Sequence, residues 1–145
     1  YNKGGNYMFE FLIDLLSATV SLTIFLISIT ITIIAWYRLF EKAGVEGWKA
    51  LIPIYNIWCY YNIATNGINT GIWFFAPLLL GWIPIVGWLI TAISYLYINY
   101  NFAKRYTNND LLIILHLIPA LSPLIKLILA FGNYGFDNKK YETKF

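Results

Sequence analysis

The sequence predicts an all-α integral membrane protein with about four transmembrane helices in a proline-kinked bundle. Of its 145 residues, 59% are hydrophobic and 12% are charged, whereas soluble domains are roughly 45–50% apolar and about 25% charged. A soluble domain of this length leaves much of its surface in water and has no place for so much apolar area. The distribution of charge supports the same class, because long stretches of the chain carry none.

Three apolar stretches predict the crossings. Residues 15–36 contain no Asp, Glu, Lys or Arg, and this run exceeds the roughly 20 residues that cross a hydrocarbon core as helix. Residues 50–103 also contain none; as one helix they would extend about 81 Å, so they have to cross about twice. Residues 111–131 are interrupted only by His116 and Lys126, and they supply the fourth crossing.

The first two helices have recognisable ends. We expect the first over residues 10–36, continuing as far as residue 41, with Gly44 terminating it. The second, over residues 48–64, is short for a crossing, and Pro53 and Asn56 lie inside it. We therefore expect a kink or a partly re-entrant start there.

The third and fourth helices follow two polar turns. Residues 71–103 exceed one crossing, so we expect one long bent helix with its break near Pro84. The fourth helix is expected to start at Asn109 and Asp110, which can cap it. These elements form a single transmembrane domain over residues 10–132, between an N-terminal tail, 1–9, and a polar C-terminal tail, 133–145. Met8 is a plausible initiator, so residues 1–7 are either an added segment or a native tail.

A proline motif recurs in three of these segments. Residues 51–54 are Leu-Ile-Pro-Ile, residues 82–85 are Trp-Ile-Pro-Ile and residues 117–120 are Leu-Ile-Pro-Ala. Such a repeat is compatible with duplicated units, as in transporters with broken helices near the membrane midplane. The interpretation we favour is plainer: these are prolines tolerated within transmembrane helices, where Ile and Leu are the usual neighbours.

The charges bear on partners and orientation. The net charge of +3 comes from scattered Lys and Arg, without the basic face that nucleic acid requires, so no nucleic-acid partner is expected. The expected partners are the lipid bilayer and either a protein in the membrane or a second copy of this chain. The expected location is a bacterial cytoplasmic membrane, as a multi-pass protein. Positive residues in the two loops at 37–49 and 104–109 favour a cytoplasmic side there, and three lysines in the C-terminal tail oppose it.

Ionisable residues within a membrane are costly and are therefore candidates for function. Asp14 lies near a helix N-terminus, where the helix dipole stabilises a carboxylate. His116 is a proton-relay group, a partner for Asp14 or a neutral core histidine, and we favour the last. Lys126 is expected to extend its long stem to the interface. One His and one distant Cys do not make a metal site, and no metal or cofactor is expected.

A second candidate site is the loop after the first helix and the start of the next. Its function is open between a helix-to-helix turn held by Trp48 in the headgroup layer and a docking surface for a partner membrane protein. Asn56 and the other amides in or near the spans are expected to bridge helices. The residues of this candidate interaction loop are Lys42, Gly44, Gly47, Trp48, Pro53, Tyr55 and Asn56.

The same loop carries a family resemblance. Residues 40–56 resemble the F-x-K-A-G-x-x-G-W-x-x-L-I-P-x-Y-N stretch of DUF5684, a family of small bacterial membrane proteins of unknown function. Residues 82–86 resemble its second proline motif, and residues 130–133 followed by Tyr141 resemble its C-terminal end. Residues 103–107 match the family's A-x-x-F-G-K segment only loosely. Members are sometimes labelled signal peptidase I, which implies a link to secretion.

Peptidase chemistry of that type needs a serine nucleophile and a lysine base. Ser122 and Lys126 are spaced to share a helix face, but Pro123 lies between them and no oxyanion-forming element is recognisable, so we expect no enzyme. We expect a non-enzymatic accessory or structural subunit of a membrane complex. The alternatives are a small transporter or channel that uses His116, and a secretion-related, signal-peptidase-like membrane protein.

Overall fold

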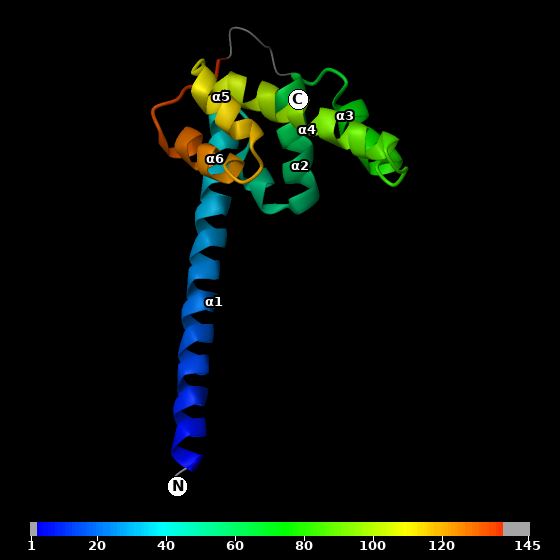
Figure 1. Ribbon diagram of the computed structural model, residues 1–145. Coiled ribbons are helices and arrows are strands. Elements are labelled where there is room, and N and C mark those ends of the chain that lie inside the picture. Colours follow the sequence, from blue (N-terminus) through cyan, green and yellow to red (C-terminus); the bar gives the residue numbers. More distant parts are fainter. Residues whose placement is uncertain (1–2, 138–145) are drawn as a thin grey trace. The chain divides into compact units, whose positions relative to one another are not determined.

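The computed structural model describes residues 3–137. These residues form helices and turns and no strand, which confirms the all-α class; Figure 1 labels the helices in chain order. The expected C-terminal tail lies outside the described residues from 138 onward, as do residues 1–2 of the N-terminal tail. The elements are α1 (Lys3–Lys42), the 3-10 turn η1 (Gly47–Leu51), α2 (Pro53–Thr65), α3 (Thr70–Leu80), α4 (Val86–Tyr106), α5 (Asp110–Leu117) and α6 (Ser122–Phe131).

The chain divides into two compact units, Tyr1–Ile33 and Ile34–Phe145. Within the described residues, one helix, Tyr7–Lys42, is long and apolar enough to cross a membrane. The four predicted crossings are therefore not confirmed as four spanning helices. The first unit contributes most of that helix, and only 6% of its most apolar window is buried within the protein.

Most hydroxyls of the first unit are bonded within α1. Six of its serine and threonine hydroxyls donate to backbone carbonyls three or four residues earlier; Thr23 bonds to Thr19 and Ser28 to Ile24, each over 2.8 Å. These six hydroxyls do not have to find water. A helix rich in Ile, Val and Thr is a poor helix in water, but in lipid it keeps every backbone group paired.

The end of α1 confirms the expectation for Gly44. Its φ of 75° is one that glycine adopts without steric cost. The amide of Gly44 donates to the Glu41 carbonyl over 3.0 Å, and that of Val45 to the Phe40 carbonyl over 2.9 Å. These two bonds are the Schellman pattern of helix termination. The helix begins at Lys3, within the expected N-terminal tail, and runs one residue beyond the expected limit, to Lys42.

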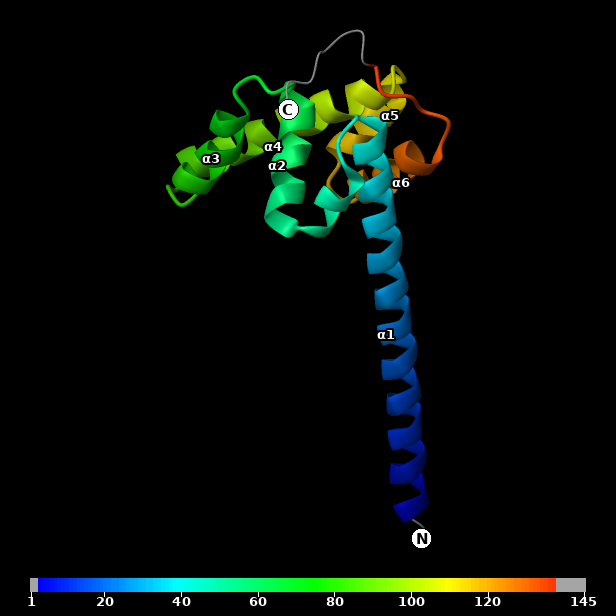
Figure 2. The same cartoon turned by 180° about the vertical axis from the view of Figure 1, so that it is seen from behind.

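In the second unit, the helices alternate in direction. Tyr60 of α2 bonds to Asn99 of α4, and the Ala64 carbonyl accepts from Arg105, so α2 and α4 run the same way. Helix α3 follows α2 and precedes α4 in the chain, and it runs in the opposite direction to both. Its Trp73 stacks on Tyr97 of α4. Figures 1 and 2 both show α3 lying beside the first half of α4 as a helical hairpin.

The three proline motifs lie at helix boundaries, which differs from the expected kinks. Pro53 is the first residue of α2, Pro84 lies in the turn between α3 and α4, and Pro119 lies in the turn between α5 and α6. Each of the expected third and fourth crossings is thus two helices joined by a turn. Proline lacks the amide hydrogen that would continue the hydrogen-bond ladder of a helix. After Pro84 the backbone of Ile85 adopts a φ of 65°, and α4 begins at the next residue.

Candidate functional site

The interior of the second unit holds a buried polar cluster, made of Tyr60, Asn99, His116 and Ser122. Tyr60 lies midway along α2, on the face that α4 and α5 cover, and it is 8% exposed. Its hydroxyl donates to Asn99 Oδ1 over 2.6 Å. The Asn99 amide nitrogen donates in turn to the Tyr95 carbonyl over 2.8 Å, so this amide bridges two helices as the sequence predicted.

His116 connects the two ends of the cluster. It is fully buried on α5, with Nε2 3.5 Å from the Tyr60 hydroxyl and Nδ1 3.4 Å from Ser122 Oγ. A neutral imidazole has one donor and one acceptor nitrogen, which is enough for both hydroxyls. This arrangement supports the interpretation of a neutral core histidine.

Lys126 contacts two aromatic rings. Its Nζ lies 4.8 Å from the centroid of the Trp36 ring and 4.8 Å from that of Tyr60, and its extension to a membrane interface stays a prediction. The lysine is half-buried on α6, and the two rings come from α1 and α2. Cation–π contact with the faces of Trp and Tyr accounts for this position.

A pocket of about 370 Å³ opens beside the cluster. Its polar lining includes Tyr60, Asn99, Ser122 and Lys126, and its apolar lining includes Pro77, Ile98, Pro119 and Pro123. Ser122 Oγ faces the His116 ring over 3.4 Å, while the Lys126 ammonium lies against two aromatic rings. Ser122 and Lys126 are thus each engaged with another partner.

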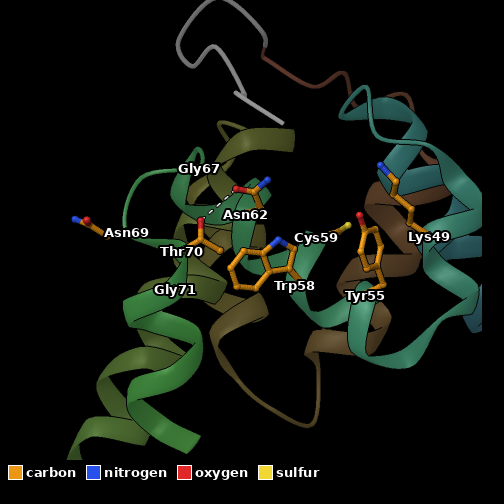
Figure 3. Close-up of a pocket in the computed structure, with 9 residues that line it drawn as sticks. All are labelled: Lys49, Tyr55, Trp58, Cys59, Asn62, Gly67, Asn69, Thr70 and Gly71. Atoms are coloured by element: carbon orange, nitrogen blue, oxygen red, sulfur yellow. Dashed lines mark hydrogen bonds between the residues drawn. The ribbon is translucent and has the colours of Figure 1, made fainter.

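A second pocket, of about 510 Å³, lies on the other face of α2 (Figure 3). Its rim is polar: the Thr70 hydroxyl donates to Asn62 Oδ1 over 3.1 Å, the bond drawn dashed in Figure 3. Lys49 lines it, but its Nζ already has the Glu46 carboxylate at 3.4 Å. Lys49, the charged residue of this lining, is therefore paired with a residue outside the lining. The remaining lining residues are Tyr55, Trp58, Cys59, Gly67, Asn69 and Gly71.

Most residues of the candidate interaction loop serve contacts within the chain. The Lys42 ammonium donates to the carbonyls of Leu129 and Gly132, over 2.7 and 3.0 Å. Gly47 lies under the Tyr37 ring, where a Cβ would come within 2.6 Å of a ring carbon. Gly44 ends α1 and Pro53 starts α2, as described above. These residues shape the turn between α1 and α2, as the interpretation of a helix-to-helix turn requires.

Two aromatic residues of that loop stay exposed. Trp48 and Tyr55 stack with ring centroids 6.3 Å apart and planes 9° apart, and Trp48 is 49% exposed. Asn56 faces inward and donates from Nδ2 to the Ala50 carbonyl over 3.0 Å, which ties α2 to η1. The docking interpretation therefore remains a prediction for the Trp48–Tyr55 pair alone.

Asp14 and His116 lie in different units. Asp14 is exposed on α1, where its backbone carbonyl accepts from the Ser17 hydroxyl over 2.8 Å. Sequence reasoning missed two members of the Lys126 environment, Trp36 and Tyr60. Tyr60 is buried, and no local pattern distinguishes it from Tyr61.

Comparison with known proteins gives one result. A family model described as "Family of unknown function (DUF5684)" matches residues 48–139, which is more than half of the chain. No curated protein and no solved structure matches. The matched region contains the polar cluster, both pockets and all three proline motifs.

Proposed function

This chain belongs to DUF5684, a family of unknown function, and from its geometry we propose that it is a non-enzymatic accessory or structural subunit of a membrane complex in a bacterial cell. In this proposal α1 crosses the bilayer. Helices α2–α6 enter one leaflet from the side on which α1 ends, with their polar turns at the headgroups and their proline turns near the midplane.

The observation that carries this proposal is the meeting of the polar turns. Arg105, near the end of α4, donates to Asn66 Oδ1 over 3.4 Å, and its carbonyl accepts from the Asp137 amide over 3.0 Å. Lys42, at the end of α1, reaches the Gly132 carbonyl after α6 over 3.0 Å. The turns that carry charge or amide groups thus share one end of the second unit.

The proline turns lie at the other end, because α2, α4 and α6 all start there. This end carries large exposed apolar side chains: Ile54 is 75% exposed, Trp82 81% and Ile85 76%. Residues 50–103 contain no charged residue. An end of this kind has no favourable contact with water, whereas the hydrocarbon of a leaflet covers it without cost.

Three of the helix lengths fit one leaflet. Helix α2 has 13 residues, α3 has 11 and α6 has 10, which corresponds to about 15–20 Å at 1.5 Å per residue. The hydrocarbon core is about 30 Å thick, so these three helices reach about halfway. Helix α4, with 21 residues, is about 32 Å long and in this proposal lies strongly tilted within the leaflet. Four full crossings would put Asn66 and Arg105 on opposite faces of the membrane, and a separation of 3.4 Å does not support that arrangement.

The accessory role is supported by the surface of α1. A helix that is apolar on all sides and little buried within its own chain has to be covered by lipid or by helices of a partner. Six of its serine and threonine hydroxyls are already bonded along the helix, so it is compatible with either cover. Small polar residues on such a helix also allow close helix packing.

Cysteine labelling tests the insertion. In a Cys59→Ser background, single cysteines replace the exposed residues Ile68, Asn108 and Asn133, and Trp82→Cys serves as the control at the proline end. A membrane-impermeant maleimide should label the first three from the same face, and Trp82→Cys from neither. Labelling of Ile68→Cys and Asn133→Cys from the face opposite to Asn108→Cys would support four crossings and overturn the one-leaflet insertion.

Purification in a mild detergent tests the role. Mass spectrometry of the full chain extracted from its native membrane should identify a protein that co-purifies reproducibly. Recovery of a monomer with no such protein would contradict the accessory role while leaving the insertion result intact.

A further inference from the structure

We propose that the pocket beside Lys126 binds a membrane amphiphile with an anionic head, either a carboxylate or a phosphate, and that this head pairs with the Lys126 ammonium. The inference rests on the membrane insertion proposed above, because insertion brings lipid to the pocket. It goes beyond the proposed role in naming a ligand class for a specific site.

The charge of Lys126 is the first argument. Within residues 3–137, the groups recorded against its ammonium are the rings of Trp36 and Tyr60, with no carboxylate or carbonyl. Two other lysines of this unit have stronger partners: Lys49 has Glu46, and Lys42 has two carbonyls. Lys104 donates to the Tyr100 hydroxyl over 3.3 Å. A half-buried ammonium loses hydration, and cation–π contact restores only part of it. An anionic group in the pocket would restore the rest.

The shape and lining of the pocket are the second argument. Its volume of about 370 Å³ lies at the lower end of the range for small-ligand sites. This is room for a head group and the start of a chain, and not for a whole lipid. Lys126 is the cationic residue of the lining, and the hydroxyl-bearing residues of the same lining are Tyr60, Tyr61, Thr91, Tyr95 and Ser122.

The apolar lining of the pocket explains why the ligand is an amphiphile. Pro77, Pro119 and Pro123 belong to this lining; Pro119 lies in the α5–α6 turn, at the apolar end of the unit. An inorganic anion would gain nothing from these side chains, whereas an alkyl chain would bury apolar area against them. The head would contact Lys126, and the chain would leave the pocket along the proline turns.

The polar cluster holds the cationic side in place. The Tyr60 hydroxyl is fixed by Asn99 over 2.6 Å, and Ser122 faces His116 over 3.4 Å. Tyr60 also supplies one of the two rings against the ammonium. A site whose polar groups are already oriented loses little freedom when a ligand binds.

Binding by the full-length, detergent-purified protein tests the inference. The probes are oleate, phosphatidylglycerol, zwitterionic phosphatidylcholine and uncharged monoolein, measured by native mass spectrometry and by the rise in Tm. Oleate or phosphatidylglycerol should bind more tightly than the two probes without net charge. Lys126→Met should weaken that binding by about tenfold, the effect of losing one charge-assisted contact. Lys104→Met, on the polar end of α4, should leave it unchanged.

Lys126→Arg separates charge from folding, because it keeps the cation; it should bind within about threefold of the parent, a small free-energy difference. Binding of oleate alone would identify a fatty acid, and binding of phosphatidylglycerol alone a phospholipid; both support the inference. Equal binding of all four probes, or binding that is unchanged in Lys126→Met, would overturn it. The assay needs no bilayer, so its failure is distinct from a failure of the labelling test.

Discussion

Asn66 and Arg105 join the ends of two helices that the sequence pattern places on opposite sides of a membrane. The Arg105 guanidinium donates to Asn66 Oδ1 and to the Ala64 carbonyl, each over 3.4 Å. Arg105 is 4% exposed, so protein groups rather than water stabilise its charge. The pair joins the polar end of α2 to that of α4, so the α3–α4 hairpin begins and ends on the same side of the second unit.

Replacing Arg105 should weaken the second unit. We expect Arg105→Met to lower the free energy of unfolding by about 1.5–3 kcal/mol, because it removes buried hydrogen bonds made by a charged group. Thermal unfolding in a mild detergent measures the change. Lys104→Met is the matched control: this neighbour is partly exposed, and its loss should stay within about 0.5 kcal/mol. Equal losses in the two variants would contradict the role given to Arg105.

The turn between α3 and α4 depends on a close backbone approach at Gly87. A Cβ there would lie 2.7 Å from the carbonyl carbon of Gly81, and neither backbone can move without opening the turn. We expect Gly87→Ala to cost about 1–3 kcal/mol, as overpacking does. Gly71→Ala is the control, since its Cβ would meet only the Phe75 ring at 4.0 Å. Unfolding midpoints that fall equally in both variants would contradict this account.

What the sequence could predict was local. The end of α1 at Gly44 follows from one glycine after an apolar run, and the structure confirms it through two backbone bonds. The prolines at 53, 84 and 119 are visible as breaks. A proline that kinks a continuing helix and a proline that turns the chain back carry the same local signal. Tertiary contacts decide between them, and the Asn66–Arg105 pair is one such contact.

The candidate site was less predictable for the same reason. His116 and Lys126 stand out in an apolar stretch, and both belong to the site region. The direction of the Lys126 side chain depends on Trp36, ninety positions earlier in the chain. The local sequence is the same for a Lys126 side chain that extends to the membrane interface and for one that lies against two rings. The burial of Tyr60 in place of Tyr61 likewise depends on which helices cover α2.

The bond between Tyr60 and Asn99 should appear as an energetic coupling. Tyr60→Phe leaves the buried Asn99 oxygen without its donor, and we expect a loss of about 1–2 kcal/mol. Asn99→Ala should cost a similar amount or more, since it also loses the bond to the Tyr95 carbonyl. In the double variant the losses should fall short of their sum by about 0.5–1.5 kcal/mol. Full additivity would contradict the bond.

Tyr61→Phe is the control for that cycle. Tyr61 neighbours Tyr60 on α2, and within the described residues no bond is recorded for its hydroxyl. Its loss should stay within about 0.5 kcal/mol in the same unfolding assay. If Tyr61→Phe lowered the free energy of unfolding as much as Tyr60→Phe does, the effect would not be specific to the bond between Tyr60 and Asn99.

Trp82 should lie deep in the hydrocarbon of the bilayer. Its side chain is 81% exposed at the turn that follows α3, so only the surrounding medium covers it. We expect a variant that keeps Trp82 as its single tryptophan to be quenched most by lipids brominated near the chain ends. Trp73 lies one turn from the start of α3 and stacks on Tyr97, about 13 Å closer to the polar end along the helix than Trp82. A variant that keeps only Trp73 should therefore be quenched most by lipids brominated near the head. Quenching of Trp82 by aqueous iodide, with no effect of brominated lipid, would show that this turn faces water and would contradict the insertion.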